Sequence, residues 1–210
     1  MDHRIILVPQ GAEHRAVCRG LRRSTAPKPI VQAIPVGAEP VRRHLLQLRS
    51  DFFQPQAPVL VLGLCGSLSP RLSVGDVVLY RSLSTVPLHL PTSGTPHLVT
   101  GLTLDRVLSS AAEKRELGAS GADVVDMEGQ AILEVLNSLD IPVTMLRVVS
   151  DDCHYDLPDL SQAVSPEGNL LPGRMAIAMA QKPIAALRLI RGSLHALKVL
   201  QAVVSELYQS

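Results

Sequence analysis

Aromatic side chains are scarce in this 210-residue chain, which has no tryptophan, two phenylalanines and three tyrosines. Proteins that bind single-stranded nucleic acid stack the bases on aromatic rings, and this chain has too few rings for such a platform. A carbohydrate-binding module built on exposed rings is excluded for the same reason. Ligand recognition must therefore depend on polar and aliphatic groups.

A net charge of one sign is also lacking. The chain has 20 Lys and Arg residues against 19 Asp and Glu residues, which gives a formal net charge of +1. A nucleic-acid-binding surface needs an excess of basic residues to neutralise the phosphates. We therefore expect no nucleic-acid partner, and a small molecule is the expected ligand.

Cysteine is limited to Cys18, Cys65 and Cys153, which form no Cys-x-x-Cys pair and have no histidine at ligand spacing. This pattern predicts free thiols, with neither a disulfide framework nor a metal site. No run of eighteen uninterrupted apolar residues occurs, and the N-terminus does not resemble a signal peptide. We expect a cytoplasmic protein.

Short apolar runs recur along the chain and alternate with helix-like stretches. The runs cover residues 5–8, 30–34, 59–62, 77–79, 124–125 and 143–149, and the helix-like stretches cover residues 40–48, 104–117 and 128–139. Such alternation is typical of α/β proteins. We predict a single three-layer α/β domain over residues 1–210, with a central, mostly parallel mixed sheet flanked by helices.

The last predicted element is an amphipathic helix over residues 183–207. Its apolar stripe comprises Leu187, Ile190, Leu194 and Leu197, and its basic stripe comprises Arg188, Arg191, His195 and Lys198. We expect the apolar stripe to pack on the domain and the basic stripe to face solvent. Basic amphipathic helices also bind anionic membrane surfaces, so a membrane partner is the second, less favoured interpretation.

Four of the predicted strands end in segments that carry reactive side chains. These segments cover residues 9–15, 63–67, 126–129 and 150–152. In open α/β sheets, ligands bind beyond the carboxyl ends of the strands. We therefore expect one shared site in which Glu128 and Asp151 supply two carboxylates. The irregular segment 82–100 is a candidate binding loop.

These motifs resemble the purine nucleoside phosphorylase and uridine phosphorylase superfamily, which includes the methylthioadenosine/S-adenosylhomocysteine nucleosidases. The resemblance lies in residues 61–70 with 74–78, in 125–131, and in 141–143 with 147–151. The segment from residue 157 onward resembles the hopanoid-associated branch of that family. The resemblance implies cleavage of the N-glycosidic bond of a purine nucleoside by a homo-oligomer that needs no cofactor, with phosphate as co-substrate in the phosphorylases.

The resemblance also implies roles for individual residues. Asp151 matches the general acid that protonates purine N7 as the glycosidic bond breaks, and Ser150 directly precedes it. Glu128 matches the glutamate that accepts hydrogen bonds from the ribose hydroxyls, and Met127 matches the methionine that packs on the ribose. Cys65 and Gly66 lie in the glycine-rich segment of the same substrate site.

Two nucleophiles remain open at the end of the first strand. Glu13 resembles the glutamate with which nucleosidases activate water, whereas Gly11 and Arg15 have the spacing of a phosphate-binding loop. Val61 and Leu64 stand at phosphate-site positions where hexameric phosphorylases carry an arginine and a serine, so a phosphate would be poorly held. Hydrolysis is therefore slightly favoured over phosphorolysis, and a catalytically silent nucleoside-binding protein is a further alternative.

Overall fold

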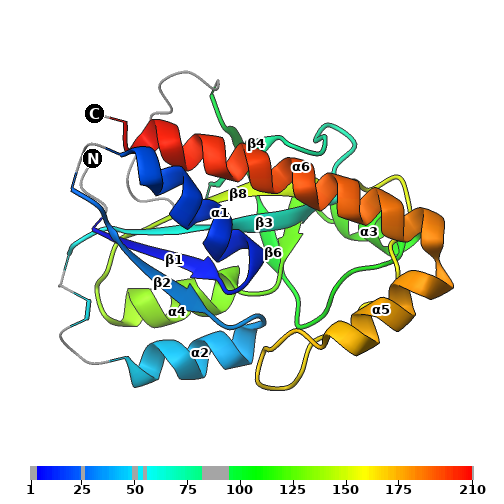
Figure 1. Cartoon of the computed structure of the whole chain (residues 1–210), viewed down its shortest axis with the longest axis horizontal. Helices are drawn as coiled ribbons and strands as arrows, with labels where there is room; N and C mark the ends of the chain where they lie inside the picture. The colour runs from blue at the N-terminus through cyan, green and yellow to red at the C-terminus, as the bar shows by residue number, and fades with distance from the viewer. Residues whose placement is uncertain (1–3, 25–26, 49–51, 54–55, 82–94, 210) are drawn as a thin grey trace.

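The computed structural model describes residues 4–24, 27–48, 52–53, 56–81 and 95–209 (Figure 1). The strands are β1 (Ile5–Pro9), β2 (Ile30–Ile34), β3 (Val59–Ser67), β4 (Val77–Tyr80), β5 (His97–Val99), β6 (Gly101–Thr103), β7 (Val124–Asp126) and β8 (Val143–Asp151). The helices are α1 (Ala12–Gly20), α2 (Ala38–Gln47), α3 (Ala111–Ala119), α4 (Gly129–Ser138), α5 (Pro172–Gln181) and α6 (Pro183–Leu207), and a short 3₁₀ turn covers Leu21–Arg23. Most of the predicted binding loop, residues 82–94, lies outside the described residues, and β5 lies in the remainder.

The strands form one mixed sheet with the order β2-β1-β3-β8-β4-β5, and β7 joins β6 to β3. The β1–β2, β1–β3 and β3–β8 pairs are parallel, while β4 runs antiparallel to β8 and β7 antiparallel to β3. The predicted α/β class with a mostly parallel mixed sheet is therefore confirmed.

Helices cover both faces of this sheet (Figure 1). Side chains alternate along a strand, so Ile6 and Val8 of β1 pack toward α1 and α6, whereas Leu7 packs toward α2 and α4. Val41 of α2 and Leu136 of α4 are buried on this second face. The sheet is thus buried between two helical layers, and its polar residues concentrate at the strand ends.

Strand β3 is longer than predicted, because residues 63–67 continue the strand instead of following it. Glycine is unfavourable in strands, which explains why the apolar pattern stops early. Gly63 has a packing reason, since a Cβ atom there would lie 2.1 Å from Nη1 of Arg147. The strand therefore carries the glycine-rich segment directly to the site.

The predicted helix over residues 104–117 begins too early. The structure has strand β6 and an irregular stretch first, and helix α3 starts after Ser110, whose hydroxyl accepts a hydrogen bond from Glu113 N at 3.4 Å. Leu104 N donates to Asp126 O at 2.9 Å, which extends the pairing of β6 with β7. Leu102 and Leu104 pack in a small cluster with Leu108. Residues 104–110 therefore precede helix α3 and are not part of it.

The prediction for the buried face of the C-terminal helix is wrong for three of its four residues, whereas Leu197 is partly buried and packs on the core as predicted. Helix α6 buries Ala186, Ala196, Leu200, Val203 and Val204, while Leu187, Ile190 and Leu194 are 47%, 45% and 56% exposed. Small residues decide which side approaches the sheet, since a Cβ atom at Gly192 would lie 2.3 Å from Ser150 O. None of the helices in the described part of the chain has the length and apolar composition that a membrane crossing requires.

Candidate active site

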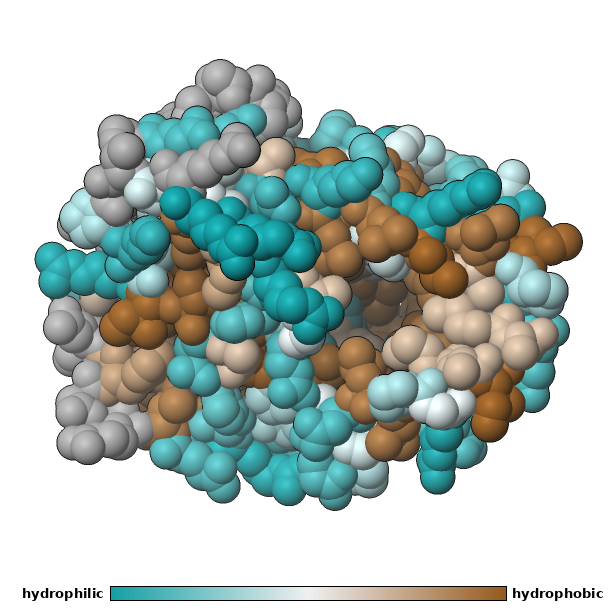
Figure 2. Space-filling view, viewed as in Figure 1, coloured by the Kyte–Doolittle hydropathy of each residue, from teal (hydrophilic) through white to brown (hydrophobic). Residues whose placement is uncertain are grey.

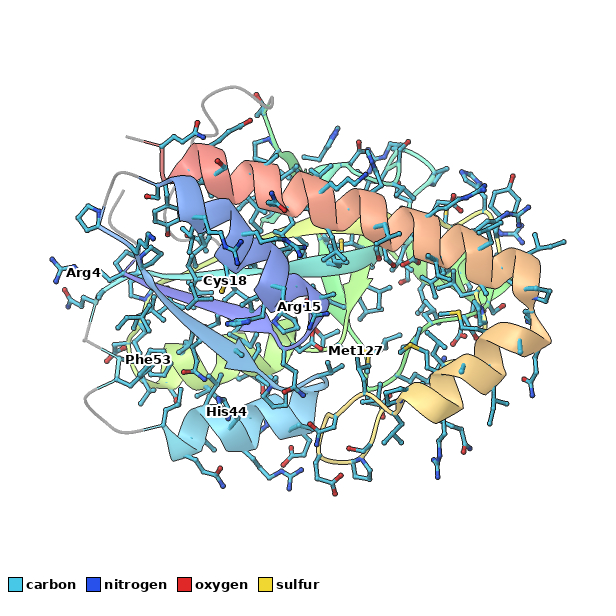
Figure 3. The ribbon with its side chains drawn as sticks, viewed as in Figure 1. Arg4, Arg15, Cys18, His44, Phe53 and Met127 are labelled. Atoms are coloured by element: carbon cyan, nitrogen blue, oxygen red, sulfur yellow. The ribbon has the colours of Figure 1, made fainter. Side chains whose placement is uncertain are left out.

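A cavity of about 250 Å³ opens where β1, β3, β7 and β8 end. Its wall includes seven of the residues singled out in the sequence: Glu13, Cys65, Gly66, Met127, Glu128, Ser150 and Asp151. Figure 2 shows a hollow in this face of the molecule, and Met127, labelled in Figure 3, lies beside it. Strands β1, β3 and β8 are parallel and end at the same sheet edge. Strand β7 runs antiparallel to the last residues of β3, with Val125 beside Gly66, and this pairing brings Met127 and Glu128 to the same place.

The two candidate phosphate-binding residues do not line this cavity. Gly11 precedes helix α1 with a φ of +93°, and Arg15 points outward from α1 as an exposed side chain (Figure 3). Helix α1 therefore brings Glu13 to the cavity wall, whereas Arg15 is exposed and is not part of the lining.

Glu128 occupies the N-cap position of α4 and is 5% exposed. Its Oε1 atom accepts a hydrogen bond from Gly37 N at 3.0 Å, and its Oε2 atom lies 3.7 Å from Nη2 of Arg147. Burial raises the pKa of Glu128 above its ordinary value, and the charge of Arg147 opposes that rise. The carboxylate is thus held in place from two sides at the cavity wall.

Arg147 is a fully buried residue of β8 to which the sequence assigned no role. Its Nη2 atom donates to Asp126 Oδ2 at 3.0 Å and its Nη1 atom to Leu62 O at 3.4 Å. The Nε atom has no hydrogen-bond partner among the described residues. A guanidinium buried in a strand needs carboxylate partners. The position of an arginine inside an apolar run could therefore have identified Arg147 from the sequence.

Asp126 anchors this buried cluster and uses both carboxylate oxygens. Its Oδ1 atom accepts from Thr103 Oγ1 at 2.7 Å and from Gly129 N at 3.1 Å, at the start of α4. Its Oδ2 atom accepts from the Tyr80 hydroxyl at 3.1 Å as well as from Arg147. The cluster therefore joins β4, β6, β7, β8 and the start of α4 beneath the cavity.

Lys114 is the second residue that sequence reasoning missed. It is a fully buried residue of α3, and its Nζ atom forms an ion pair with Asp151 Oδ2 and donates to Asp152 O at 2.9 Å. Its neighbours in sequence, residues 113–116, are all charged, so nothing in the local pattern distinguished it. Lys114 fixes one oxygen of the Asp151 carboxyl group and leaves Oδ1 as the other polar contact point.

The Asp151 Oδ1 atom contacts Ser150. The Ser150 hydroxyl lies 2.8 Å from this oxygen and 3.1 Å from Cys65 O. A hydroxyl carries one proton and donates to one acceptor at a time. Ser150 therefore lies between the Asp151 carboxyl group and the β3 backbone, and both oxygens of Asp151 have a polar partner.

Glu13 faces the same cavity from α1. Its Oε1 atom accepts a hydrogen bond from Leu64 N at 2.8 Å. Burial, with the nearby charge of Glu128 as a second cause, raises the pKa of Glu13 to about 7. A carboxyl group with this pKa exchanges protons near neutral pH, which suits a general base.

Comparison with known sequences adds a family match. The sequence model of the Phosphorylase superfamily matches residues 94–169, the segment that carries Lys114, Glu128 and Asp151. The match covers about a third of the chain and shows a likeness to this superfamily over that segment. No curated protein sequence matches the chain.

Solved structures share the fold of this chain. Futalosine hydrolase of Helicobacter pylori is 17% identical with a TM-score of 0.59, over 96% of this chain and 97% of that one. The 5'-methylthioadenosine/S-adenosylhomocysteine nucleosidase from the same organism is 16% identical with a TM-score of 0.55, over 96% and 97% of the two chains. The corresponding Campylobacter jejuni nucleosidase is 14% identical with a TM-score of 0.55, over 95% and 99%. At these identities the likeness shows the shared fold.

Proposed function

We propose that the protein hydrolyses the N-glycosidic bond of a purine nucleoside or nucleoside-like compound. The observation that supports this most is the convergence of Glu13, Glu128 and Asp151 on one cavity that Met127 also lines. Structures that share the fold are named as futalosine hydrolase and nucleosidases, which supports the same reaction class. We further propose that the enzyme is a cytoplasmic homo-oligomer that needs no cofactor.

In the proposed reaction, Asp151 transfers a proton to purine N7 while the bond from N9 to C1′ breaks. The base then leaves neutral, and the sugar passes through an oxocarbenium-like state. Glu128 accepts hydrogen bonds from the ribose hydroxyls, and Met127 packs on the sugar. Each positioned proton-transfer group typically contributes about 10²–10⁴ in rate.

Glu13 completes the proposed reaction. It accepts a proton from a water molecule whose oxygen adds to C1′, so the products are the free base and the free sugar. Asp151 regains its proton from solvent and Glu13 releases its proton, which balances the cycle. The position of Glu13 at the cavity wall, with Arg15 outside, favours water over phosphate.

Product analysis with and without phosphate tests the proposal. We expect base release from purified enzyme in phosphate-free buffer, with free sugar as the second product by chromatography. The substrate panel consists of adenosine, inosine, guanosine, methylthioadenosine and a 5′-alkylated adenosine. Release that depends strictly on phosphate and yields a sugar 1-phosphate would establish the phosphorylase alternative. Nucleoside binding by calorimetry without any base release would establish the catalytically silent nucleoside-binding protein.

The pH dependence of the rate tests the role of Glu13. A general base acts in its ionised form, so the rate should rise with pH and level off above the Glu13 pKa of about 7. One pH unit below this pKa, about a tenth of the carboxyl groups is ionised, and we expect about a tenfold lower rate. The rate of base release between about pH 5 and pH 9 measures this.

Two variants test whether Glu13 causes the fall in rate at low pH, the acid limb of the profile. Glu13→Gln should remove the limb and lower the plateau rate by about 10²–10⁴. Glu134→Gln, at an exposed glutamate of α4, serves as the matched control and should keep the wild-type profile. A Glu13→Gln enzyme that retains the limb would show that another group is the base.

A further inference from the structure

Helix α5 is apolar in composition and yet buries none of its residues. Its ten residues include Met175, Ile177 and Met179, and Ile177 is 62% exposed. An isolated helix of this length is marginal in water, because helices in proteins depend on packing of an apolar face. Among the described residues α5 packs mainly against α6, so its outer side has no cover in a single copy.

The adjoining half of α6 continues this uncovered apolar surface. Ile184, Leu187, Ile190 and Leu194 are 70%, 47%, 45% and 56% exposed. They recur at three- and four-residue spacing and therefore share one side of the helix. Figure 2 shows brown surface in the region where Figure 1 places α5 and this part of α6. Exposed apolar surface of this extent marks an interaction site.

The charge carried by α5 and α6 themselves is mostly of one sign. Between residues 172 and 207, the cationic residues are Arg174, Lys182, Arg188, Arg191 and Lys198, and Glu206 is the single acidic residue. Arg191 and Lys198 follow Leu187 by four and eleven residues and therefore lie on its side of α6. Long basic side chains beside an apolar stripe lay their stems along it and extend their charges outward.

We propose that the outer face of α5 and the first half of α6 binds an anionic lipid bilayer. The apolar stripe enters the acyl boundary, and the flanking cations contact lipid phosphates, as in helices that lie in the membrane interface. A second copy of the chain fits this face less well, because self-association would place its cations against the same cations of the partner.

The proposed membrane face adjoins the candidate active site. Leu189 of α6 lines the first cavity, while its neighbours Leu187 and Ile190 point outward. Arg188, Arg191 and His195 line a second cavity of about 400 Å³, whose wall also includes Ser150 and Asp151. Membrane contact therefore involves the helix that closes one side of the site.

Vesicle sedimentation tests the proposal on the full-length protein. We compare vesicles of phosphatidylcholine alone with vesicles that also contain phosphatidylglycerol, at low and at high salt. The anionic vesicles should bind the protein at least about tenfold more tightly, and high salt should remove most of that difference. Equal or absent binding to the two lipid mixtures would overturn the proposal.

A matched pair of double variants locates the surface. Leu187→Ser with Leu194→Ser should lower vesicle binding at least about tenfold. Leu46→Ser with Leu98→Ser, at leucines that are 65% and 55% exposed elsewhere, should leave it unchanged. All four side chains are exposed, so both variants should fold, which circular dichroism checks. Equal loss in both variants would contradict the assignment.

An oligomer that dissociates only in the first variant, with no vesicle binding by the wild type, would identify this face as a contact between copies.

Discussion

Replacing Asp151 with asparagine should lower the turnover of the enzyme by about 10²–10⁴, equivalent to roughly 3–5 kcal/mol of barrier. The amide keeps the shape of the side chain and its oxygen still accepts from Lys114, but it lacks the carboxylic proton that the proposed reaction transfers to the departing base. Lys114 also keeps its second acceptor, Asp152 O. Base release under saturating substrate measures the effect.

The neighbouring carboxylate provides the control for this experiment. Asp152 does not line the first cavity, and its Oδ1 atom accepts from His154 N at 2.9 Å. Asp152→Asn should therefore retain turnover within a few-fold of wild type. If Asp151→Asn remained as active as Asp152→Asn, the assignment of Asp151 as the general acid would be wrong. Thermal melting distinguishes lost chemistry from lost folding in both variants.

Replacing Arg147 with methionine should lower the free energy of unfolding by about 3–5 kcal/mol. The methionine fills much of the volume but leaves Asp126 and Glu128 buried without their shared cation. An uncompensated buried carboxylate is costly because the desolvation penalty of the charge remains. Urea unfolding monitored by circular dichroism gives the change from the midpoint and slope.

An exposed ion pair supplies the comparison. Arg42 of α2 contacts Glu134 of α4 at 2.6 Å, with 38% and 42% of the two side chains exposed. Arg42→Met should cost at most about 1 kcal/mol, because solvent screens such pairs. Combining Arg147→Met with Asp126→Asn should recover part of the loss, since the second change removes one stranded charge. A similar cost for Arg147→Met and Arg42→Met would show that burial does not govern the Arg147 cluster.

Much of the candidate site was predictable because parallel strands deliver their ends to one edge of the sheet. The apolar runs identified strands β1, β2 and β8 within two residues at each end, and the segments at the ends of β1 and β8 supplied Glu13 and Asp151. Glu128 follows β7, which reaches the same edge by antiparallel pairing with β3. These predictions needed only local patterns and one general rule of α/β architecture. The spacing of Gly11 and Arg15 predicted a phosphate-binding loop, but Arg15 is an exposed residue of α1. Spacing alone therefore did not show where the side chain lies.

By itself, the sequence determined the α/β class and the main strands, because the apolar pattern of a strand can be read within a few residues. The same pattern indicated which segments lie at the strand ends. Tertiary structure alone decided the partners of Lys114 and Arg147, because ion pairs between distant elements leave no local pattern. It also decided which side of α6 is buried. There the close approach of Gly192 to Ser150 outweighs the larger leucines, which remain exposed on the opposite side.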